Sequence, residues 1–247
     1  MARMALPVEA LDWLAVWQGV RGLVLASDLS LPRRLASAGH ALFALTDDHA
    51  LAGKLGSIPR VTPLLARPEA IPVDPWQFEV VFAHQNLHRF DLTNALPQLA
   101  RVIRPGGCLS ASYLVRDDTV PWVRRLAALL RRYDPMAMRG DYGHASLRAL
   151  HASKYFADVE ERAFRVWQRM GRDDLLTLVR QQPLAANLDE AQLNQLLTQV
   201  GELYDGAVRP GEALRLPFQL IGARAWVTHE ELTAPVRIPD NGLNIPL

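Results

Sequence analysis

The sequence predicts an α/β protein whose mostly parallel β-sheet carries helices on both faces. Two observations support this prediction. Short apolar runs alternate with helical segments through the first half of the chain, and this pattern is typical of consecutive βαβ units. The chain has 247 residues, of which 49% are hydrophobic and 21% are charged, so it is long and apolar enough to bury the core of such a sheet.

The first two pairs of strand and helix are expected near the start of the chain. The apolar run 22–27 predicts a buried strand, and a helix over 30–39 follows it with Ser30 placed to cap the first turn. Residues 40–46 form the second expected strand. The helix expected over 47–56 opens with two acidic residues, which suit the positive end of a helix dipole.

Three further strands and one helix complete the alternating part of the chain. Residues 60–66 predict a third strand, and Pro63 inside it favours a position at an edge of the sheet. The run FEVVFA (78–83) is short, β-branched and aromatic, which predicts a fourth, buried strand. A helix is expected over 91–104 and a fifth strand over 106–115.

The second half of the chain contains two clear amphipathic helices. Residues 119–134 predict the first, with Thr119 as its cap, and residues 187–206 predict the second, with Asn187 as its cap and Glu190 completing a capping box. The first helix carries a stripe of arginines, namely Arg124, Arg125, Arg131 and Arg132. A solvent-exposed face is the favoured interpretation of this stripe, and phosphate binding is the alternative.

Composition argues against several classes of protein. Lys and Arg total 27 against 26 Asp and Glu, which gives a net charge of +1 at pH 7, so bulk charge gives no reason to expect binding to nucleic acid or to an anionic membrane. The sequence shows neither a secretion signal nor an apolar run of about 18 residues that could span a membrane. The single cysteine, Cys108, is compatible with a reducing cytoplasm, where the protein is expected to act.

Two histidines four residues apart, His84 and His88, raise the question of a metal site. On a helix this spacing would place both imidazoles on one face. The strand before them places them in a loop instead, and Gln85 stands where a zinc protease has its glutamate general base. No third ligand lies nearby in the sequence, so no metal site is predicted.

The segment FEVVFAHQNLHRFD, followed by RVIRPGG, is the most informative part of the sequence. It resembles the class I S-adenosylmethionine-dependent methyltransferases, many of which have an F-D-x-V strand, a histidine before an aromatic residue, and a helix leading into R-V-L-x-P-G-G. The matching positions are Phe78, Glu79, Val81, His88, Phe90, Arg101, Val102, Ile103, Pro105, Gly106 and Gly107. Pro105 is expected to end the helix, and the two glycines to permit a tight turn into the next strand.

The resemblance implies the Rossmann-like fold of that family, with a mostly parallel seven-stranded sheet. It implies one domain over residues 1–228, with a helical insertion or cap at about 119–155 and 172–206, and then an extended tail over 229–247. It also implies S-adenosylmethionine as the cofactor if the protein is active, and it assigns no catalytic residue. The residues expected to hold the cofactor are Ser27, Asp47, Glu69, His84, Gln85 and His88.

The sequence departs from the family in the loop after the first strand. In the family this loop is rich in glycine, so that backbone N–H groups can approach the methionine part and the sugar of the cofactor. Here no glycine lies between Gly22 and Gly39. The acidic residue that ends the second strand in the family is replaced by Thr46, with Asp47 one residue later to accept the ribose hydroxyls.

Three functions follow from this combination of likeness and departure. The leading hypothesis is a methyltransferase-fold protein with an eroded cofactor site, acting as a non-catalytic subunit or scaffold in a homo- or hetero-oligomer with an active methyltransferase homologue. The second is an active methyltransferase for a small molecule, in which Glu69 lies near the adenine and His84 or His88 faces the acceptor. The third is a protein of the same fold that binds another nucleotide or metabolite.

Overall fold

The computed structural model describes residues 6–135, 137–138, 143–209 and 212–233. A seven-stranded sheet runs through them in the order β3-β2-β1-β4-β5-β7-β6. The strands are β1 (Arg21–Leu25), β2 (Ala41–Thr46), β3 (Val61–Leu65), β4 (Phe78–His84), β5 (Ile103–Arg116), β6 (Phe156–Met170) and β7 (Leu214–Val227). Strands β1 to β5 pair in parallel, and β7 lies antiparallel between β5 and β6. The predicted mostly parallel seven-stranded sheet is therefore confirmed.

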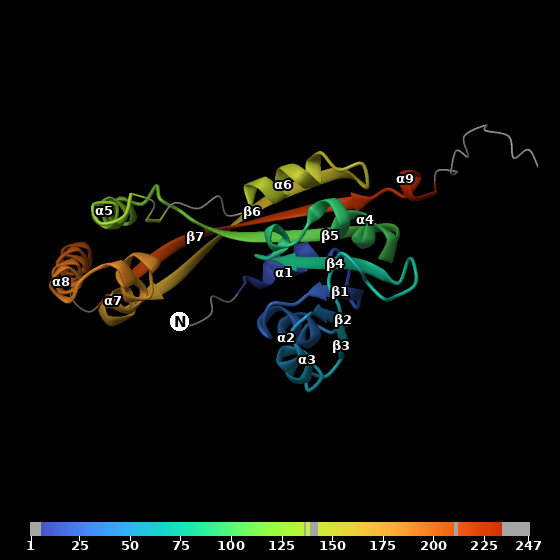
Figure 1. Cartoon of the computed structure of the whole chain (residues 1–247), viewed down its shortest axis with the longest axis horizontal. Helices are drawn as coiled ribbons and strands as arrows, with labels where there is room; N and C mark the ends of the chain where they lie inside the picture. The colour runs from blue at the N-terminus through green and yellow to red at the C-terminus, as the bar shows by residue number, and fades with distance from the viewer. Residues whose placement is uncertain (1–5, 136, 139–142, 210–211, 234–247) are drawn as a thin grey trace, which may run out of the picture.

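Helices cover both faces of this sheet, as the sequence predicts (Figure 1). On one face α1 (Val8–Ala15), α2 (Ser30–Ser37) and α3 (His49–Leu55) pack their apolar side chains into one core. On the other face α4 (Leu92–Val102) and α6 (His144–His151) contribute to a second core. The sheet is thus enclosed by two helical layers, and the loops at the ends of its strands are left to form a site.

The motif around Pro105 does not end the helix as predicted. Helix α4 ends at Val102, and β5 begins directly at Ile103. The pairing between β4 and β5 changes register here, from Phe78–Ile103 to Val80–Cys108. Strand β4 advances by two residues and β5 by five, so β5 bulges at this point. Pro105 has no N–H to donate to the regular hydrogen bonds between strands. A bulge, where those hydrogen bonds are interrupted, can therefore contain it.

Three predicted helix caps, at Ser30, Thr119 and Asn187, are also wrong. Asn187 ends a short 3-10 helix, η2 (Pro183–Asn187), and the cap of α8 (Glu190–Ala207) is Asp189, whose carboxylate accepts the Gln192 N–H at 2.8 Å. Helix α2 is preceded by Leu29 and α5 (Pro121–Leu130) by Val120, neither of which offers a side-chain cap. Each error is one or two residues. At α8 two residues able to cap a helix lie close together, and at α2 and α5 the helix starts beside the predicted cap without using its side chain.

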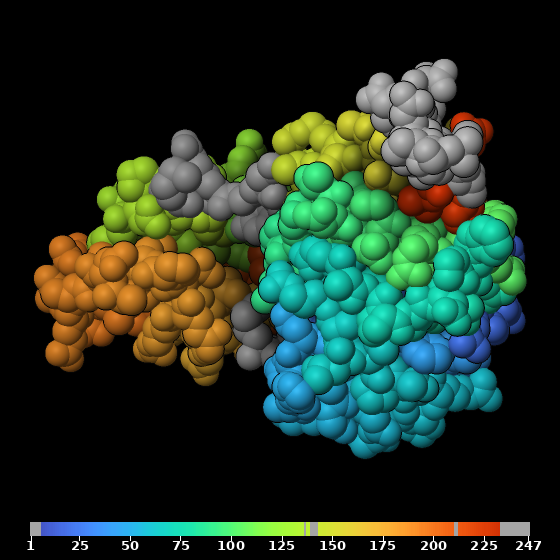
Figure 2. Space-filling model, turned by 45° about the vertical axis from the view of Figure 1, so that its right-hand side comes forward, coloured from blue at the N-terminus to red at the C-terminus, as the bar shows by residue number. Residues whose placement is uncertain are grey.

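Strands β5, β6 and β7 continue past the other four strands and meet a separate group of helices (Figure 1). This group comprises α5, α7 (Arg172–Arg180), η2 and α8, and together with the strand ends that they cover we call it the arm. The arm has its own core, in which Val123, Leu126, Leu175, Leu196 and Val200 are fully buried. Figure 2 shows the arm projecting from the body formed by the first half of the chain.

The predicted insertion spans two structurally different parts. Within 119–155, α5 belongs to the arm, whereas α6 packs on the sheet through Leu147 and Leu150. At the other end of the chain, α9 (Glu230–Thr233) is a short helix at the start of the predicted extended tail, and residues 234–247 lie outside the described residues. Within the described part of the chain, no helix has the length and apolar character to cross a membrane.

Candidate functional site

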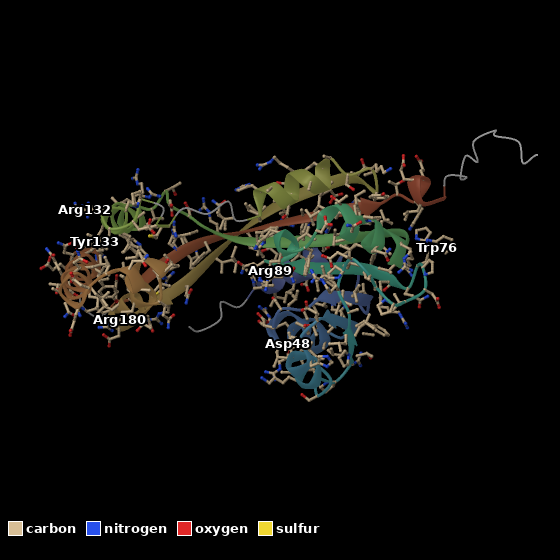
Figure 3. All side chains as sticks on the ribbon, viewed as in Figure 1. Asp48, Trp76, Arg89, Arg132, Tyr133 and Arg180 are labelled. Carbon is tan, nitrogen blue, oxygen red and sulfur yellow. The ribbon has the colours of Figure 1, made fainter. Side chains whose placement is uncertain are left out.

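A cavity of about 220 Å³ lies where β1, β2, β3 and β4 end. Its lining consists of Ala26, Ser27, Leu45, Thr46, Asp47, Asp48, Leu51, Ala66, Arg67, Pro68, Asn86, Arg89 and Phe90. Strand β1 has β2 on one side and β4 on the other, so the direction of strand order reverses here. Open α/β sheets bind ligands outside the carboxyl ends of their strands at such a reversal. Asp48 and Arg89, labelled in Figure 3, come to the cavity from the β2 end and from the loop after β4.

Two adjacent aspartates at the end of β2 have different roles. The Asp48 carboxylate accepts the N–H groups of Ala50 at 2.8 Å and Leu51 at 3.1 Å, so it caps α3. Asp47 is exposed, and within the described residues its carboxylate has no hydrogen bond or ion pair. Asp47 is therefore the carboxylate that this edge of the cavity offers to a ligand, and the neighbouring Asp48 is occupied by the fold.

Asn86 is, with Thr46, one of two buried polar residues of the cavity lining. Its Nδ2 donates to the Leu25 carbonyl oxygen at 2.7 Å, which connects the loop after β4 to the end of β1. Because a carbonyl oxygen only accepts, the amide nitrogen must face Leu25, and the side-chain oxygen is the atom left over. That Oδ1 is buried without a hydrogen-bond partner in the described part of the chain. Asn86 thus holds the loop after β4 against the end of β1, and its Oδ1 stays a buried acceptor.

A small hollow of about 10 Å³ lies between the loop after β1 and His84, and it shares Ala26 and Ser27 with the cavity. Its remaining lining residues include Asp28, Pro32 and His84. Asp28 Oδ1 accepts the Ser30 N–H at 2.6 Å, which holds the loop against the start of α2. A volume of roughly 10–15 Å³ admits a single water molecule, so this hollow has no room for a larger group.

His84 closes the hollow from the end of β4. Its Nδ1 lies 2.9 Å from Ser112 Oγ, and its Nε2 lies 3.5 Å from Gln85 Nε2. Because an amide nitrogen can only donate, Nε2 accepts and Nδ1–H donates to Ser112. Burial lowers the pKa of His84 to about 4, although the negative charge of Asp28 acts in the opposite direction. The imidazole is therefore neutral at neutral pH and is too weak a base for proton abstraction there.

The remaining predicted site residues lie around the cavity without lining it. Glu69 Oε1 accepts the Asp91 N–H at 3.1 Å, which joins the loop after β3 to the start of α4. Burial acts to raise the pKa of Glu69, but hydrogen bonds from backbone N–H groups and from Arg67 hold it below its usual value. Gln85 has a positive φ of 54° in the turn that ends β4. The exposed ring of His88 packs against Tyr113, with 6.0 Å between ring centroids.

His84 and His88 thus make separate contacts, His84 with Ser112 and His88 with Tyr113. Within the described residues, no group of three or more His, Cys, Asp or Glu side chains is arranged to hold a metal ion. Of the six predicted residues, Ser27 and Asp47 line the cavity and His84 lines the adjoining hollow. The basic stripe is not part of this site, since Arg132 lies on the arm, far from Asp48 and Arg89 (Figure 3).

The sequence missed three residues of the lining that matter most, namely Asn86, Arg89 and Phe90. Phe90 was matched only as a family position, and Asn86 and Arg89 stand in a loop where Asn and Arg are common. Their short distance from the end of the fourth strand could have identified them, because ligand-binding residues of open sheets follow the strand ends.

A second, open groove of about 290 Å³ adjoins the cavity at Ser27, Asp48 and Leu51 and leads to Lys54.

S-adenosylmethionine, the cofactor that the fold implies, fits this site only in part. The larger cavity offers a carboxylate for ribose hydroxyls and apolar walls from Leu45, Pro68 and Phe90. Those features suit a nucleoside. The methionine part would have to lie toward the loop after β1. The hollow between that loop and His84 has only about 10 Å³, whereas the open groove lined by Ser27, Asp28 and Leu29 has about 290 Å³. The residues present therefore fit the nucleoside, and the hollow beside His84 does not fit the amino-acid chain.

No protein-family model matches the sequence. A protein of Mycobacterium tuberculosis named an uncharacterised methyltransferase is 33% identical over 132 residues, which are 53% of this chain and 54% of that protein. A methyltransferase-like protein of Schizosaccharomyces pombe is 36% identical over 64 residues, which are 26% of this chain and 25% of that protein. The chain thus matches about half the length of the first relative and a quarter of the second.

Solved structures resemble the whole fold. A proposed type II methyltransferase of Anaeromyxobacter dehalogenans superposes with a TM-score of 0.69 at 21% identity, over 93% of this chain and 100% of that one. A proposed methyltransferase from an antibiotic biosynthesis pathway of Anabaena variabilis gives a TM-score of 0.55 at 15% identity, over 87% and 95% of the two chains. At this identity the likeness concerns the fold alone. The chain therefore has the fold of these methyltransferase structures, and over about half of its length its sequence is similar to proteins named methyltransferases.

Proposed function

We propose that the chain is a non-catalytic member of the family, which transfers no methyl group on its own and works as a subunit beside an active methyltransferase. The observation that supports this proposal is the small hollow between the loop after β1 and the end of β4, where Asp28, Pro32 and His84 leave about 10 Å³. A donor held only by its nucleoside would have its methyl group in no defined position.

Methyl transfer depends mainly on holding donor and acceptor in line at short distance. A site that does not hold the methionine chain therefore lacks the main source of acceleration. The neutral His84 imidazole, with its low pKa, is a poor general base for an acceptor. In this proposal the fold is kept for assembly in the cytoplasm with a homologous enzyme, and the projecting arm offers a surface for that contact (Figure 2).

The test is an assay of methyl transfer by the purified full chain, alone and with any methyltransferase that co-purifies with it from its own host. Radiolabelled S-adenosylmethionine and a panel of small-molecule acceptors would be used. The expected result is no turnover by the chain alone, and higher turnover by the partner when the chain is added. Turnover by the isolated chain would contradict the proposal.

A second candidate is an active methyltransferase for a small molecule. Two observations favour it, namely the 220 Å³ cavity at the expected cofactor position and the names of the relatives in Mycobacterium and Schizosaccharomyces. In that case Asp47 would hold the ribose, and Asp28 and His84 would have to move away from the methionine chain. The same assay separates the two candidates, since the active enzyme would turn over without a partner.

A further inference from the structure

We infer that one face of the sheet, where β6 and β7 run into the arm, is a docking surface for an acidic region of a protein partner. We call it the tryptophan face, and it consists of four exposed residues, Arg165, Trp167 and Arg169 of β6 and Arg215 of β7. The inference rests on the proposed function only in taking the partner to be a protein subunit. It adds the place of the contact and the chemistry of the partner's surface.

The tryptophan face is the side of these strands that the helices of the arm do not cover. Successive side chains of a strand point to opposite faces of a sheet. In β6 the alternate residues Val166 and Met170 are buried, and Met170 lies in the core of the arm. In β7 Leu214 and Leu216 are buried in that core, whereas Arg215 between them is exposed. The arm therefore packs on one face of the two strands, and the other face is left to solvent at the four residues named.

Trp167 is the apolar centre of this face. Its side chain is 50% exposed, and its partner in the pairing of β6 with β7 is Pro217, which is buried. A tryptophan offers a large rigid apolar area and one N–H donor. Tryptophan and arginine are the residue types most enriched among those that dominate the binding energy of protein interfaces. An exposed tryptophan with arginines on both sides therefore has the composition of an interface centre.

The arginines of this face repel one another. Arg169 and Arg215 are directly opposite in the antiparallel pairing of β6 with β7, and like charges in such positions destabilise a sheet. Asp117 is the carboxylate whose pKa responds to Arg165, but its Oδ1 is already bonded to the N–H and hydroxyl of Thr119. Among the described residues, none of the three arginines is in an ion pair. Carboxylates supplied from outside would relieve this repulsion.

The distribution of charge favours an acidic protein surface over other partners. A second copy related by a twofold axis through this face would bring arginines against arginines. A nucleic acid lying along β6 would meet Glu161, which precedes Arg165 by four residues on the same face of the strand. A short acidic region with an apolar side chain fits better, since carboxylates pair closely with arginine and the apolar group covers Trp167.

Fluorescence anisotropy of labelled probes with the full chain tests the inference. The probes are a peptide of three Glu-Leu-Glu-Ser repeats, the same peptide with glutamine for glutamate, and an oligothymidylate of equal length. At low salt the acidic peptide is expected to bind at least tenfold more tightly than the glutamine peptide, and to weaken at least tenfold in about 0.5 M NaCl. Equal affinity for the two peptides, or tighter binding of the oligothymidylate, would overturn the inference.

A charge variant and its matched control locate the site. Arg215→Gln is expected to weaken the acidic peptide at least fivefold and to raise the midpoint of thermal unfolding, because it removes the like-charge pair with Arg169. Arg124→Gln, at an exposed arginine of α5 in the same arm, is expected to change neither. A lower midpoint for Arg215→Gln would show a structural role for this arginine. That result, or an equal loss of affinity in both variants, would overturn the inference.

The tryptophan is tested in the same way. Trp167→Ala is expected to weaken the acidic peptide at least tenfold. Trp76→Ala is the matched control, because Trp76 is 54% exposed and lies at the end of the molecule away from the arm (Figure 3). Unchanged affinity of Trp167→Ala would overturn the inference.

The outcomes also separate this inference from the proposed function. Methyl transfer by the isolated chain would contradict the proposed function whatever the affinities for the peptides. Undiminished co-purification of a methyltransferase with the double variant Arg169→Gln and Arg215→Gln would contradict only the inference drawn from the tryptophan face.

Discussion

The half-buried imidazole of His84 links the stability of the protein to pH. Its ordinary pKa of 6.5 falls to about 4 in the folded protein because burial disfavours the charged form. The unfolded chain therefore binds a proton below pH 6.5 that the folded chain does not bind until about pH 4. Stability contributed by the neutral imidazole is complete above pH 6.5 and declines as the pH falls through that window.

Replacing His84 by Gln is expected to flatten this pH dependence. Between pH 6.5 and 4 the wild-type protein should lose about 3 kcal/mol through this residue, and His40, whose pKa burial also lowers, adds a smaller part of its own. Urea unfolding at several pH values measures the slope. His88→Gln, an exposed histidine four residues away, is the control; an equal change in slope for both variants would contradict the assignment.

Two neighbouring glycines at the start of β5 are needed for different reasons. A Cβ on Gly107 would overlap the backbone oxygen of Glu79, whereas a Cβ on Gly106 would meet nothing within 4 Å but would have to tolerate a φ of +77°. Gly107→Ala is therefore expected to cost about 3 kcal/mol through overlap. Gly106→Ala is expected to cost about 1 kcal/mol through backbone strain. Denaturant unfolding of the two variants checks the order, and equal costs would show that the bulge relaxes.

At the scale of elements, α3 depends on one of the two aspartates that end β2. The Asp48 side chain accepts two backbone N–H groups of the first turn. Asp48→Ala should therefore lower the free energy of unfolding by about 1 kcal/mol.

Asp47→Ala provides the matched control, because Asp47 makes no hydrogen bond within the described residues. Its stability should stay within about 0.5 kcal/mol of wild type. Thermal unfolding of both variants gives the comparison. If Asp47→Ala were the more destabilised variant, the assignment of capping to one residue and ligand binding to the other would be wrong.

Caps and turns are also where the sequence predicted the elements least well. Asn187 and Asp189 are both able to cap α8, and the choice depends on the 3-10 helix η2, which has no periodic signal of its own. Pro105 is similarly a residue that often ends a helix, but the pairing of β5 with β4 places it in a bulge. Local propensity could not resolve either case, since the deciding contacts come from other elements.

At the scale of the whole molecule, the arm and the cavity belong to different cores. Leu126 is fully buried among the helices of the arm, whereas the cavity lies at the ends of β1 to β4. Leu126→Ala is expected to destabilise the arm by about 2–5 kcal/mol and to leave the strands β1 to β4 of the body as protected as before. Hydrogen exchange of α5, α7 and α8 measures the first effect, and that of β1 to β4 the second. An equal loss of protection in both parts would show that they unfold together.

The alternation of strands and helices could be predicted because each buried strand of the first half is a short apolar run bounded by turn residues. The extension of β5, β6 and β7 past the other four strands could not be predicted. Their charged and apolar residues alternate irregularly where these strands pack against the arm and no longer against the body. Asp47, expected near the cofactor from the family resemblance, lies in the cavity lining at the end of β2. Asn86 was not expected there, since its role depends on Leu25, 61 positions earlier in the chain.

Both outer strands of the sheet resist continuation by another chain. On one side β3 contains Pro63, which has no N–H to offer to a further strand. On the other side β6 is 15 residues long, and its exposed positions are rich in charge, with Glu160, Glu161, Arg162, Arg165 and Arg169. Charged residues and proline on edge strands are the usual means by which proteins avoid edge-to-edge pairing of their sheets. A partner of this protein is therefore expected to dock through side chains, and the sheet itself will remain seven strands wide in any assembly.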